Sequence, residues 1–369
     1  MYRGRAALLV ASAVTLGALG GCRPLVYVSQ VEAPAVPPSV ALQGEVPPAS
    51  TGQDGQAPIL GKPRSPTPAR PPMALPPLPF PPPGWALPPS AATPTPGPGL
   101  RQTLTDLAYG DDARQRLDLY VPASVEPVPV LLFVHGGAWS SGDKSQYAWL
   151  GVQLAQQGLL VAVTNYRLSP AVQHPQHAQD VAAATAWLYR HAAEYGGDPQ
   201  RLYLAGHSAG AHLVSLVALD ARYLAAEGIS EPIVAGVAAF AGAAYDLDAR
   251  YAATPLAPLL APAFGSDPAR WAEAAPLRYV KPGAPPFLLV HGLLDAQAPA
   301  TSAQTFATAL QQQGVPTTLY LLPQLDHFTA LLTGLAALPT FVRAPDGKPT
   351  DARRPRPGEQ ARPARGPSV

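Results

Sequence analysis

The sequence predicts an α/β protein: a mostly parallel, twisted sheet with helices on both faces. Short apolar runs without polar breaks alternate with helical patterns through the middle of the chain, as expected for strands that are buried on both sides. One run, Arg201–Ala205, passes through Gly206-His-Ser-Ala-Gly210 directly into a helical pattern. This strand–turn–helix unit is typical of such a sheet, and the rest of the chain is organised around it.

The expected elements alternate in chain order. The helix after the turn shows its apolar face at Leu213, Leu216 and Val217, an i, i+3, i+4 spacing. The other helices are expected at residues 147–157, 179–195 and 301–313, beside the one at 209–219. Strands are expected at Leu117–Val121, Val130–His135, Leu159–Thr164, Arg201–Ala205, Val234–Phe240, Phe287–Val290 and Thr317–Leu322.

Proline divides the chain into regions of different kind. Of 48 prolines, 23 lie between Cys22 and Gly99 and 6 follow Arg343. Because proline removes backbone donors and favours extended geometry, residues 22–100 are predicted to be a disordered, polyproline-II-rich linker, or alternatively a Pro-rich ligand for a partner. Residues 344–369 are predicted to be a Pro/Arg-rich disordered tail, with contact to anionic lipid or cell-wall polymer as the alternative. One globular domain is therefore expected, at residues 101–343.

The first 21 residues have the pattern of a secretory signal. Arg3 and Arg5 precede an apolar stretch at 6–19 that is too short to span a bilayer stably. The ending Leu19-Gly-Gly-Cys22 resembles a bacterial lipobox, which implies that Cys22 is lipidated and anchors the mature chain to a lipid bilayer. We expect a secreted, membrane-anchored lipoprotein of the cell envelope, in the outer membrane or at the periplasmic face where the cell has two membranes. The alternative is an ordinary signal peptide with an incidental cysteine.

Composition excludes several classes of function. A formal net charge of +1 gives no electrostatic footprint for nucleic acid. A single cysteine excludes an intrachain disulfide framework and a Cys-based zinc site. No cofactor and no metal are expected.

The turn Gly206-His-Ser-Ala-Gly210 fits a nucleophile elbow. Between a strand and a helix, it forces Ser208 into strained backbone angles and leaves its hydroxyl free above the sheet. Gly206 and Gly210 are required because a Cβ at either position would clash with the adjacent strand or helix. Ser208 is the predicted nucleophile.

A second motif, His135-Gly-Gly-Ala-Trp139, follows the expected strand at 130–135. Its glycines allow backbone N–H groups to face a cavity. The amides of Gly136, Gly137 and Ala209 are predicted to form an oxyanion hole. His135 itself is expected to brace this loop.

The base is predicted to be His327, which follows the last expected strand, where the chain order Ser, acid, His places it. The other histidines are less suited to act as the base. His207 and His212 are tied to the elbow and its helix, and His135 and His291 brace strand ends. His174, His177 and His191 lie in earlier loops and helices.

The orienting acid is predicted to be Asp295, because it follows the preceding strand and can accept the imidazole Nδ1–H of the base. Asp246 and Asp248 remain alternatives. Asp326 is expected to be solvated or to cap a helix.

Together these motifs resemble the esterase/lipase branch of the α/β-hydrolase superfamily, specifically its carboxylesterase and arylformamidase-like enzymes. The resemblance covers residues 101–343 and implies the α/β-hydrolase fold, with Ser208, Asp295 and His327 as the triad and the amides of Gly136, Gly137 and Ala209 as the hole. It implies a serine hydrolase that cleaves small carboxylic esters through an acyl-enzyme. The alternatives are an arylformamidase or peptidase-like amidase, and a surface binding module without catalysis. The matching motifs are Gly142-Asp-Lys144, Asn165-Tyr-Arg-Leu168, Gly197-Asp-Pro199, Gly206-His-Ser-Ala-Gly210, His291-Gly-Leu-Leu-Asp295 and Asp326-His327, with His135-Gly-Gly-Ala-Trp139.

Overall fold

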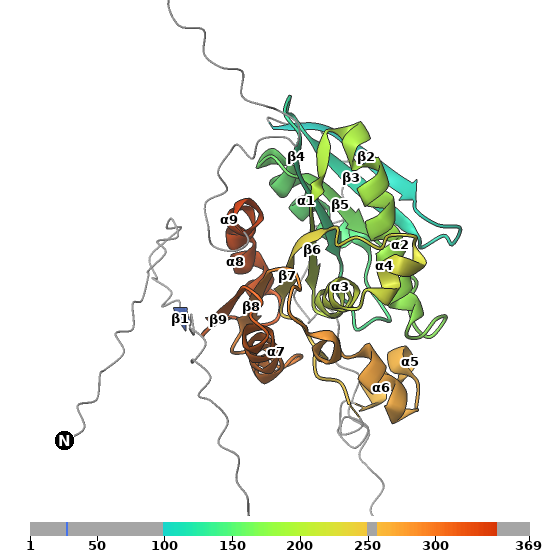
Figure 1. The fold of residues 1–369 in the computed structure, drawn as a ribbon, viewed down its shortest axis with the longest axis vertical. Coiled ribbons are helices and arrows are strands. Elements are labelled where there is room, and N and C mark those ends of the chain that lie inside the picture. The colour runs from blue at the N-terminus through green and yellow to red at the C-terminus, as the bar shows by residue number, and fades with distance from the viewer. Residues whose placement is uncertain (1–26, 29–98, 249–256, 345–369) are drawn as a thin grey trace, which may run out of the picture.

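A computed structural model describes residues 27–28, 99–248 and 257–344. Its described strands form one nine-stranded sheet, in the order β1-β9-β8-β7-β6-β4-β5-β3-β2 (Figure 1). The strands are β1 (Tyr27–Val28), β2 (Leu100–Ala108), β3 (Arg116–Pro122), β4 (Val128–Val134), β5 (Leu160–Thr164), β6 (Gly197–His207), β7 (Val234–Phe240), β8 (Phe287–Gly292) and β9 (Thr317–Leu322).

The centre of the sheet is parallel and its edges are antiparallel. Strands β4 to β9 pair in parallel with their neighbours. On one side β3 runs antiparallel to β5 and β2 antiparallel to β3, and on the other β1 runs antiparallel to β9. The predicted fold class, a mostly parallel α/β-hydrolase sheet, is confirmed.

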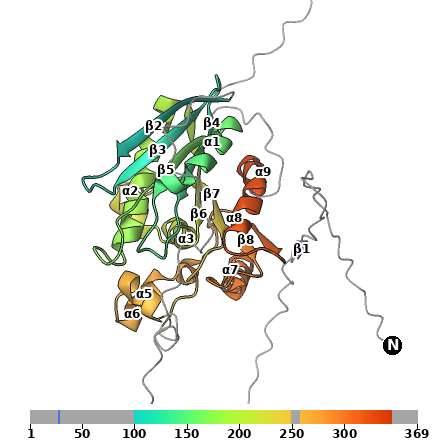
Figure 2. The same cartoon turned by 180° about the vertical axis from the view of Figure 1, so that it is seen from behind.

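Alternate side chains of each central strand enter different cores, which explains the uninterrupted apolar runs in the sequence. In β4, Leu132 and Val134 join one buried cluster, whereas Leu131 and Phe133 join the other. Helices α2 (Gln176–His191), α3 (Ala209–Leu219), α4 (Arg222–Ala226) and α7 (Ala300–Gln312) contribute to the first cluster. Helices α1 (Ala148–Gln156), α8 (Thr329–Gly334) and α9 (Leu338–Arg343) contribute to the second (Figures 1 and 2).

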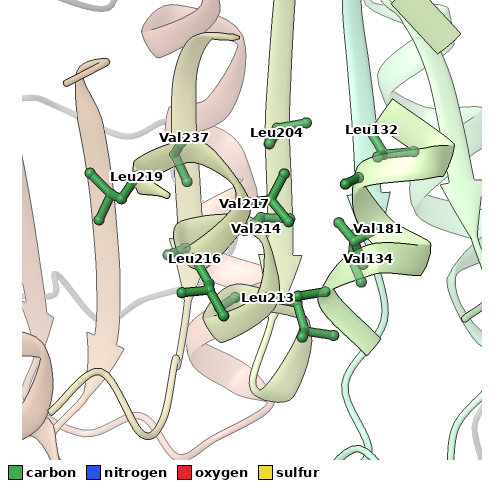
Figure 3. Close-up of a cluster of buried hydrophobic side chains, with 14 of the residues drawn as sticks. Leu132, Val134, Val181, Leu204, Leu213, Val214, Leu216, Val217, Leu219 and Val237 are labelled. Carbon is green, nitrogen blue, oxygen red and sulfur yellow. The ribbon is translucent and has the colours of Figure 1, made fainter. Parts of the chain in front are cut away.

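Helix α3 is the most deeply buried of these helices because it begins at the elbow and lies against the middle of the sheet. Leu213, Leu216 and Val217, the face expected from the sequence, are at most 1% exposed. They belong to the buried cluster that also contains Leu204 of β6 and Val237 of β7 (Figure 3). This packing holds the helix N-terminus at the carboxyl end of β6.

The expected and observed elements differ mainly at the periphery. Strand β2 was not expected, because it lies at the sheet edge and most of its side chains are at least partly exposed, which leaves no apolar run. Strand β1 lies within the segment predicted to be linker and pairs with β9 through only Tyr27 and Val28. Helices α5 (Ala257–Phe264) and α6 (Pro268–Ala274) were also missed; α5 contains Pro262, which breaks the usual helical signal.

Among the described residues, no helix is both long and apolar enough to cross a membrane. The predicted signal segment, Cys22 and the C-terminal tail lie outside the described residues.

Candidate active site

Ser208 occupies the strained turn between β6 and α3. Its backbone angles are φ 55° and ψ −119°, in the left-handed half of conformational space that side chains rarely adopt. A Cβ on Gly206 would lie 2.4 Å from the Gly210 backbone, and a Cβ on Gly210 would lie 2.1 Å from the Val134 carbonyl oxygen of β4. Both glycines are therefore required by close backbone approach, as the sequence predicted. The turn is a nucleophile elbow in geometry.

The loops that follow β8 and β9 bring the predicted acid and base together. His327 Nδ1 lies 2.7 Å from Asp295 Oδ2, and both side chains are buried. The loops approach closely because Gly292 has no side chain: a Cβ there would lie 2.1 Å from the Leu325 carbonyl oxygen. Asp295 and His327, which are 32 residues apart in the sequence, therefore meet at the carboxyl edge of the sheet.

The Asp295 carboxylate is surrounded by hydrogen-bond donors. Besides His327 it faces His291 Nε2 at 3.2 Å and accepts the backbone N–H groups of Gln297 and Ala298, each at 2.8 Å. Burial alone would raise the pKa of Asp295, but the hydrogen bonds from His291 and His327 outweigh it and hold that pKa well below its usual range. The carboxylate is therefore ionised and can stabilise an imidazolium at His327.

The second nitrogen of His327 is the one available for proton transfer. Its Nε2 atom is buried and has no hydrogen-bond partner among the described residues. The His327 ring lies 4.8 Å, centroid to centroid, from the ring of His207, the residue that precedes Ser208. Ser208 is 9% exposed, and no hydrogen bond joins its hydroxyl to another described residue. The hydroxyl of the elbow serine and the unpaired imidazole nitrogen of His327 are the components from which a nucleophile–base pair is built.

The loop after β4 passes directly beside the elbow. A Cβ on Gly136 would lie 3.0 Å from Ser208 Cβ, and Gly137 has φ +128° with no space for a side chain. The backbone N–H groups of Gly137 and Ala209 have no hydrogen-bond acceptor among the described residues. They remain candidates to stabilise an oxyanion.

The structure does not support the predicted role of Gly136 in the oxyanion hole. The Gly136 N–H group donates to the hydroxyl of Tyr147 at 3.4 Å and so faces a buried partner. The sequence motif could not distinguish the two glycines, because Tyr147 approaches from the 3-10 helix at Lys144–Tyr147, a separate element.

His135 braces the loop after β4 that carries Gly136 and Gly137 (the oxyanion-side loop), as expected. Its ring stacks on Tyr166 at 4.5 Å, and its Nδ1 atom is 2.7 Å from the Gly136 carbonyl oxygen. Burial, together with the nearby Arg114 guanidinium, lowers the pKa of His135 to about 4. A neutral, locked imidazole holds the loop and is unsuited to act as the base.

Comparison with known proteins now decides the family. The model of the BD-FAE family matches residues 117–310, which is more than half of the chain. This chain belongs to the BD-FAE family. The matched region contains Ser208 and Asp295 and ends before His327.

Relatives of this BD-FAE protein are esterases by name. It is 34% identical over 248 residues to esterase LipQ of Mycobacterium tuberculosis, covering 63% of this chain and 59% of that protein. It is 32% identical over 226 residues to a probable isoprenylcysteine alpha-carbonyl methylesterase of Arabidopsis thaliana, covering 56% of this chain and 47% of the relative. The chain thus spans about half to three-fifths of the length of these curated relatives.

Solved structures resemble the fold. Esterase B from Lactobacillus rhamnosis, in an inhibited form, matches with a TM-score of 0.56 and 28% identity, over 65% of this chain and 86% of that one. A truncated carbohydrate esterase from gut microbiota matches with a TM-score of 0.59 at 21% identity, over 68% of this chain and 98% of that one, which bears on the fold alone.

Two other histidines and two other acids weighed for the site hydrogen-bond to nearby backbone or side chains. His212 Nε2 lies 2.8 Å from the Ala274 carbonyl oxygen, and His291 Nε2 lies 2.8 Å from that of Ala298. Asp246 accepts a hydrogen bond from Ser302, and Asp326 caps the turn at Thr329. Asp295 is the acid that the structure brings to His327.

Two motifs of the sequence, Gly142-Asp-Lys144 and Asn165-Tyr-Arg-Leu168, contact each other behind the loop that follows β4. Asn165 accepts the backbone N–H of Lys144 at 2.6 Å and donates its side-chain amide to Asp143 at 2.8 Å. Asp143 also caps the 3-10 helix that ends at Tyr147. Arg114, which no motif indicated, ties the Tyr166 and Gly142 carbonyl oxygens together. These contacts fix the oxyanion-side loop from behind.

Aromatic side chains border the elbow on the side of α5. Trp139 is buried and meets His212 edge-on at 5.2 Å and Phe264 of α5 at 4.8 Å between ring centroids. Phe264 and His212 also contact each other, at 5.6 Å. This places Phe264 of α5 against Trp139, in the loop that carries Gly137. Among the described residues, no cluster of three or more His, Cys, Asp or Glu is arranged to hold a metal ion.

Proposed function

We propose that this protein is a serine hydrolase that cleaves small carboxylic esters through an acyl-enzyme. The observation that carries the proposal is the 2.7 Å contact of Asp295 with His327, together with a serine held in elbow geometry. Esterase names among the relatives support the ester as the substrate class.

In the proposed reaction His327 Nε2 accepts the proton of the Ser208 hydroxyl as its oxygen attacks the ester carbonyl carbon. Asp295 stabilises the imidazolium that results. The amides of Gly137 and Ala209 donate to the oxyanion, helped by the N-terminus of α3. The imidazolium then gives its proton to the leaving alcohol. A water molecule, deprotonated by His327, hydrolyses the acyl-serine and regenerates the enzyme.

A hydrolysis screen tests the function. Purified protein is assayed against aryl esters of graded acyl length, with N-formylkynurenine and peptide anilides included, and is labelled with a fluorophosphonate probe. We expect label on Ser208 and turnover of short-chain esters. Preferred turnover of the formamide or the anilides would reassign the protein to the amidases. Neither label nor turnover of any substrate would contradict the proposal.

We further propose that Cys22 carries lipid and displays the enzyme on a membrane of the cell envelope. The support is the Leu19-Gly-Gly-Cys22 ending and the lack of any other cysteine in the sequence. Intact-mass analysis of membrane-extracted protein should give a chain that starts at Cys22 with added acyl mass, whereas a Cys22→Ser variant should leave the membrane fraction. An unmodified, soluble wild-type chain would contradict this.

A further inference from the structure

A chain of buried hydrogen bonds runs behind the candidate site. The Gly136 N–H group is 3.4 Å from the Tyr147 hydroxyl, which is 3.0 Å from His207 Nδ1. At its other end, His207 Nε2 lies 3.0 Å from the backbone carbonyl oxygen of His327. These residues come from the oxyanion-side loop, the elbow and the loop of the base. The His207 side chain is fully buried and Tyr147 is nearly so.

The chemistry of the partners fixes the direction of each bond. A carbonyl oxygen can only accept, so His207 Nε2 must carry the hydrogen. Burial, and then the neighbouring His327, lower the pKa of His207 to about 3, so the ring is neutral and its Nδ1 atom is an acceptor. Burial raises the pKa of Tyr147 to about 12, so its phenol keeps its proton and donates to Nδ1. The Tyr147 oxygen in turn accepts from Gly136.

We propose that Tyr147 and His207 are positioning residues that set the oxyanion hole, the nucleophile and the base in register; this rests on the proposed function. Gly136 adjoins Gly137, His207 adjoins Ser208, and the carbonyl at the end of the chain belongs to the base itself. A single directional chain thus spans the groups that must be aligned for attack on a carbonyl. Misplacement of such groups by about 1 Å costs on the order of 100-fold in rate.

The side chains of this hydrogen-bond chain, Tyr147 and His207, are closely packed against their neighbours. A Cβ on Gly136 would be 3.0 Å from His207 Nδ1. The His207 ring also lies 5.3 Å from Phe328, and Tyr147 lies 5.1 Å from Phe133, between ring centroids. The Asp143 cap on the 3-10 helix fixes the backbone that carries Tyr147. Tyr147→Phe removes the hydroxyl together with its two hydrogen bonds, to Gly136 and to His207, and keeps the ring that packs on Phe133, so a fall in kcat reports the loss of those bonds.

The test compares Tyr147→Phe with Tyr245→Phe. Tyr245 is a fully buried phenol stacked on Phe306, so its variant reports the cost of losing a buried hydroxyl away from the chain. Active sites are counted by fluorophosphonate labelling, and kcat and KM are measured per labelled site together with thermal stability. We expect Tyr147→Phe to lower kcat by about 10- to 100-fold with KM within about threefold. Tyr245→Phe should keep kcat within about twofold at a similar loss of melting temperature.

A double variant tests whether Tyr147 and His207 act through the same chain of hydrogen bonds. Because one broken bond already interrupts the chain, Tyr147→Phe combined with His207→Gln should lower kcat no more than the worse single variant. Tyr147→Phe with wild-type kcat, a kcat loss shared equally by Tyr245→Phe, or fully multiplicative losses in the double variant would each overturn the inference. Wild-type protein that takes no label and hydrolyses no ester would instead overturn the proposed function.

Discussion

Two strand ends in this molecule share a sequence and differ in electrostatics. Strand β4 ends in Val134 and continues as His135-Gly136, and β8 ends in Val290-His291-Gly292. Both histidines are fully buried. His135 Nε2 faces the Arg114 guanidinium at 3.5 Å, whereas His291 Nε2 faces the Asp295 carboxylate at 3.2 Å.

In the proposed reaction, this difference would let one local motif serve both the oxyanion side and the acid side. On the β4 side, the Arg114 guanidinium faces His135, and the free amide of Gly137 can meet developing negative charge. On the β8 side, donors converge on an ionised carboxylate that can meet developing positive charge on His327. Ser208 lies between the two sides, at the end of β6.

The largest loss of kcat is expected from a substitution of Ser208, which lies between the two sides. Ser208→Ala removes the nucleophile and should lower kcat for an activated aryl ester by about 10⁴-fold or more, with the fold retained. Ser215→Ala, which removes a buried hydroxyl of α3 bonded to the Ala211 carbonyl, is the matched control. It should stay within a few-fold of wild type. Near-normal turnover by Ser208→Ala would remove this serine from the mechanism.

The role of the β4 side can be tested by displacing the backbone of its loop at Gly137. In Gly137→Ala the new Cβ would lie 2.1 Å from the Ser141 carbonyl oxygen, so the loop must shift and its amide with it. We expect kcat to fall by about 10²- to 10³-fold, the usual cost of losing an oxyanion donor. Gly158→Ala introduces a similar strain at φ +88° with no atom within 4 Å of the new Cβ. Equal losses of kcat in the two variants would contradict a specific role for Gly137.

Low pH should lower the free energy of unfolding through His135, on the β4 side. The folded-state pKa of His135 is about 4, below the value of about 6.5 expected in the unfolded chain. The unfolded state therefore binds the proton first, and the free energy of unfolding should fall as pH drops from about 6.5 to about 4. The limit for one such group is about 1.4 kcal/mol per pH unit.

Denaturant unfolding at several pH values measures this slope. His135→Gln should make this slope shallower but not remove it, because four other buried histidines with lowered pKa values keep contributing: His174, His177, His207 and His212. An unchanged slope in His135→Gln would show that this histidine is not held neutral.

The smallest effect is expected from removing the flanking segments. Residues 99–344 contain every residue assigned to the site, and β1 is bound to β9 through only Tyr27 and Val28. We expect this fragment to fold and to keep kcat within about threefold of the full chain. A soluble, folded fragment without activity would show that the flanks complete one of the two sides.

The sequence predicts the candidate triad from chain order. Ser208, Asp295 and His327 each follow a strand of the parallel part of the sheet, and parallel strands bring their carboxyl ends to one edge. The hydrogen bond from Tyr147 to His207 joins elements 60 residues apart and depends on side-chain packing, which no local pattern encodes. The same limit explains the assignment of Gly136 to the oxyanion hole, because only the tertiary contact with Tyr147 shows where its N–H group points.

The central claim is that Asp295 and His327 act as one acid–base unit on Ser208. The most direct measurement compares kcat, per labelled active site, for Asn variants of Asp295, Asp246, Asp248 and Asp326 on an activated aryl ester. Asp295→Asn should lose about 10⁴-fold because the amide cannot hold the imidazole in the required tautomer, and the other three should stay within about tenfold of wild type. If Asp295→Asn stays within tenfold while Asp246→Asn or Asp248→Asn collapses, the acid is on another strand and the account is wrong.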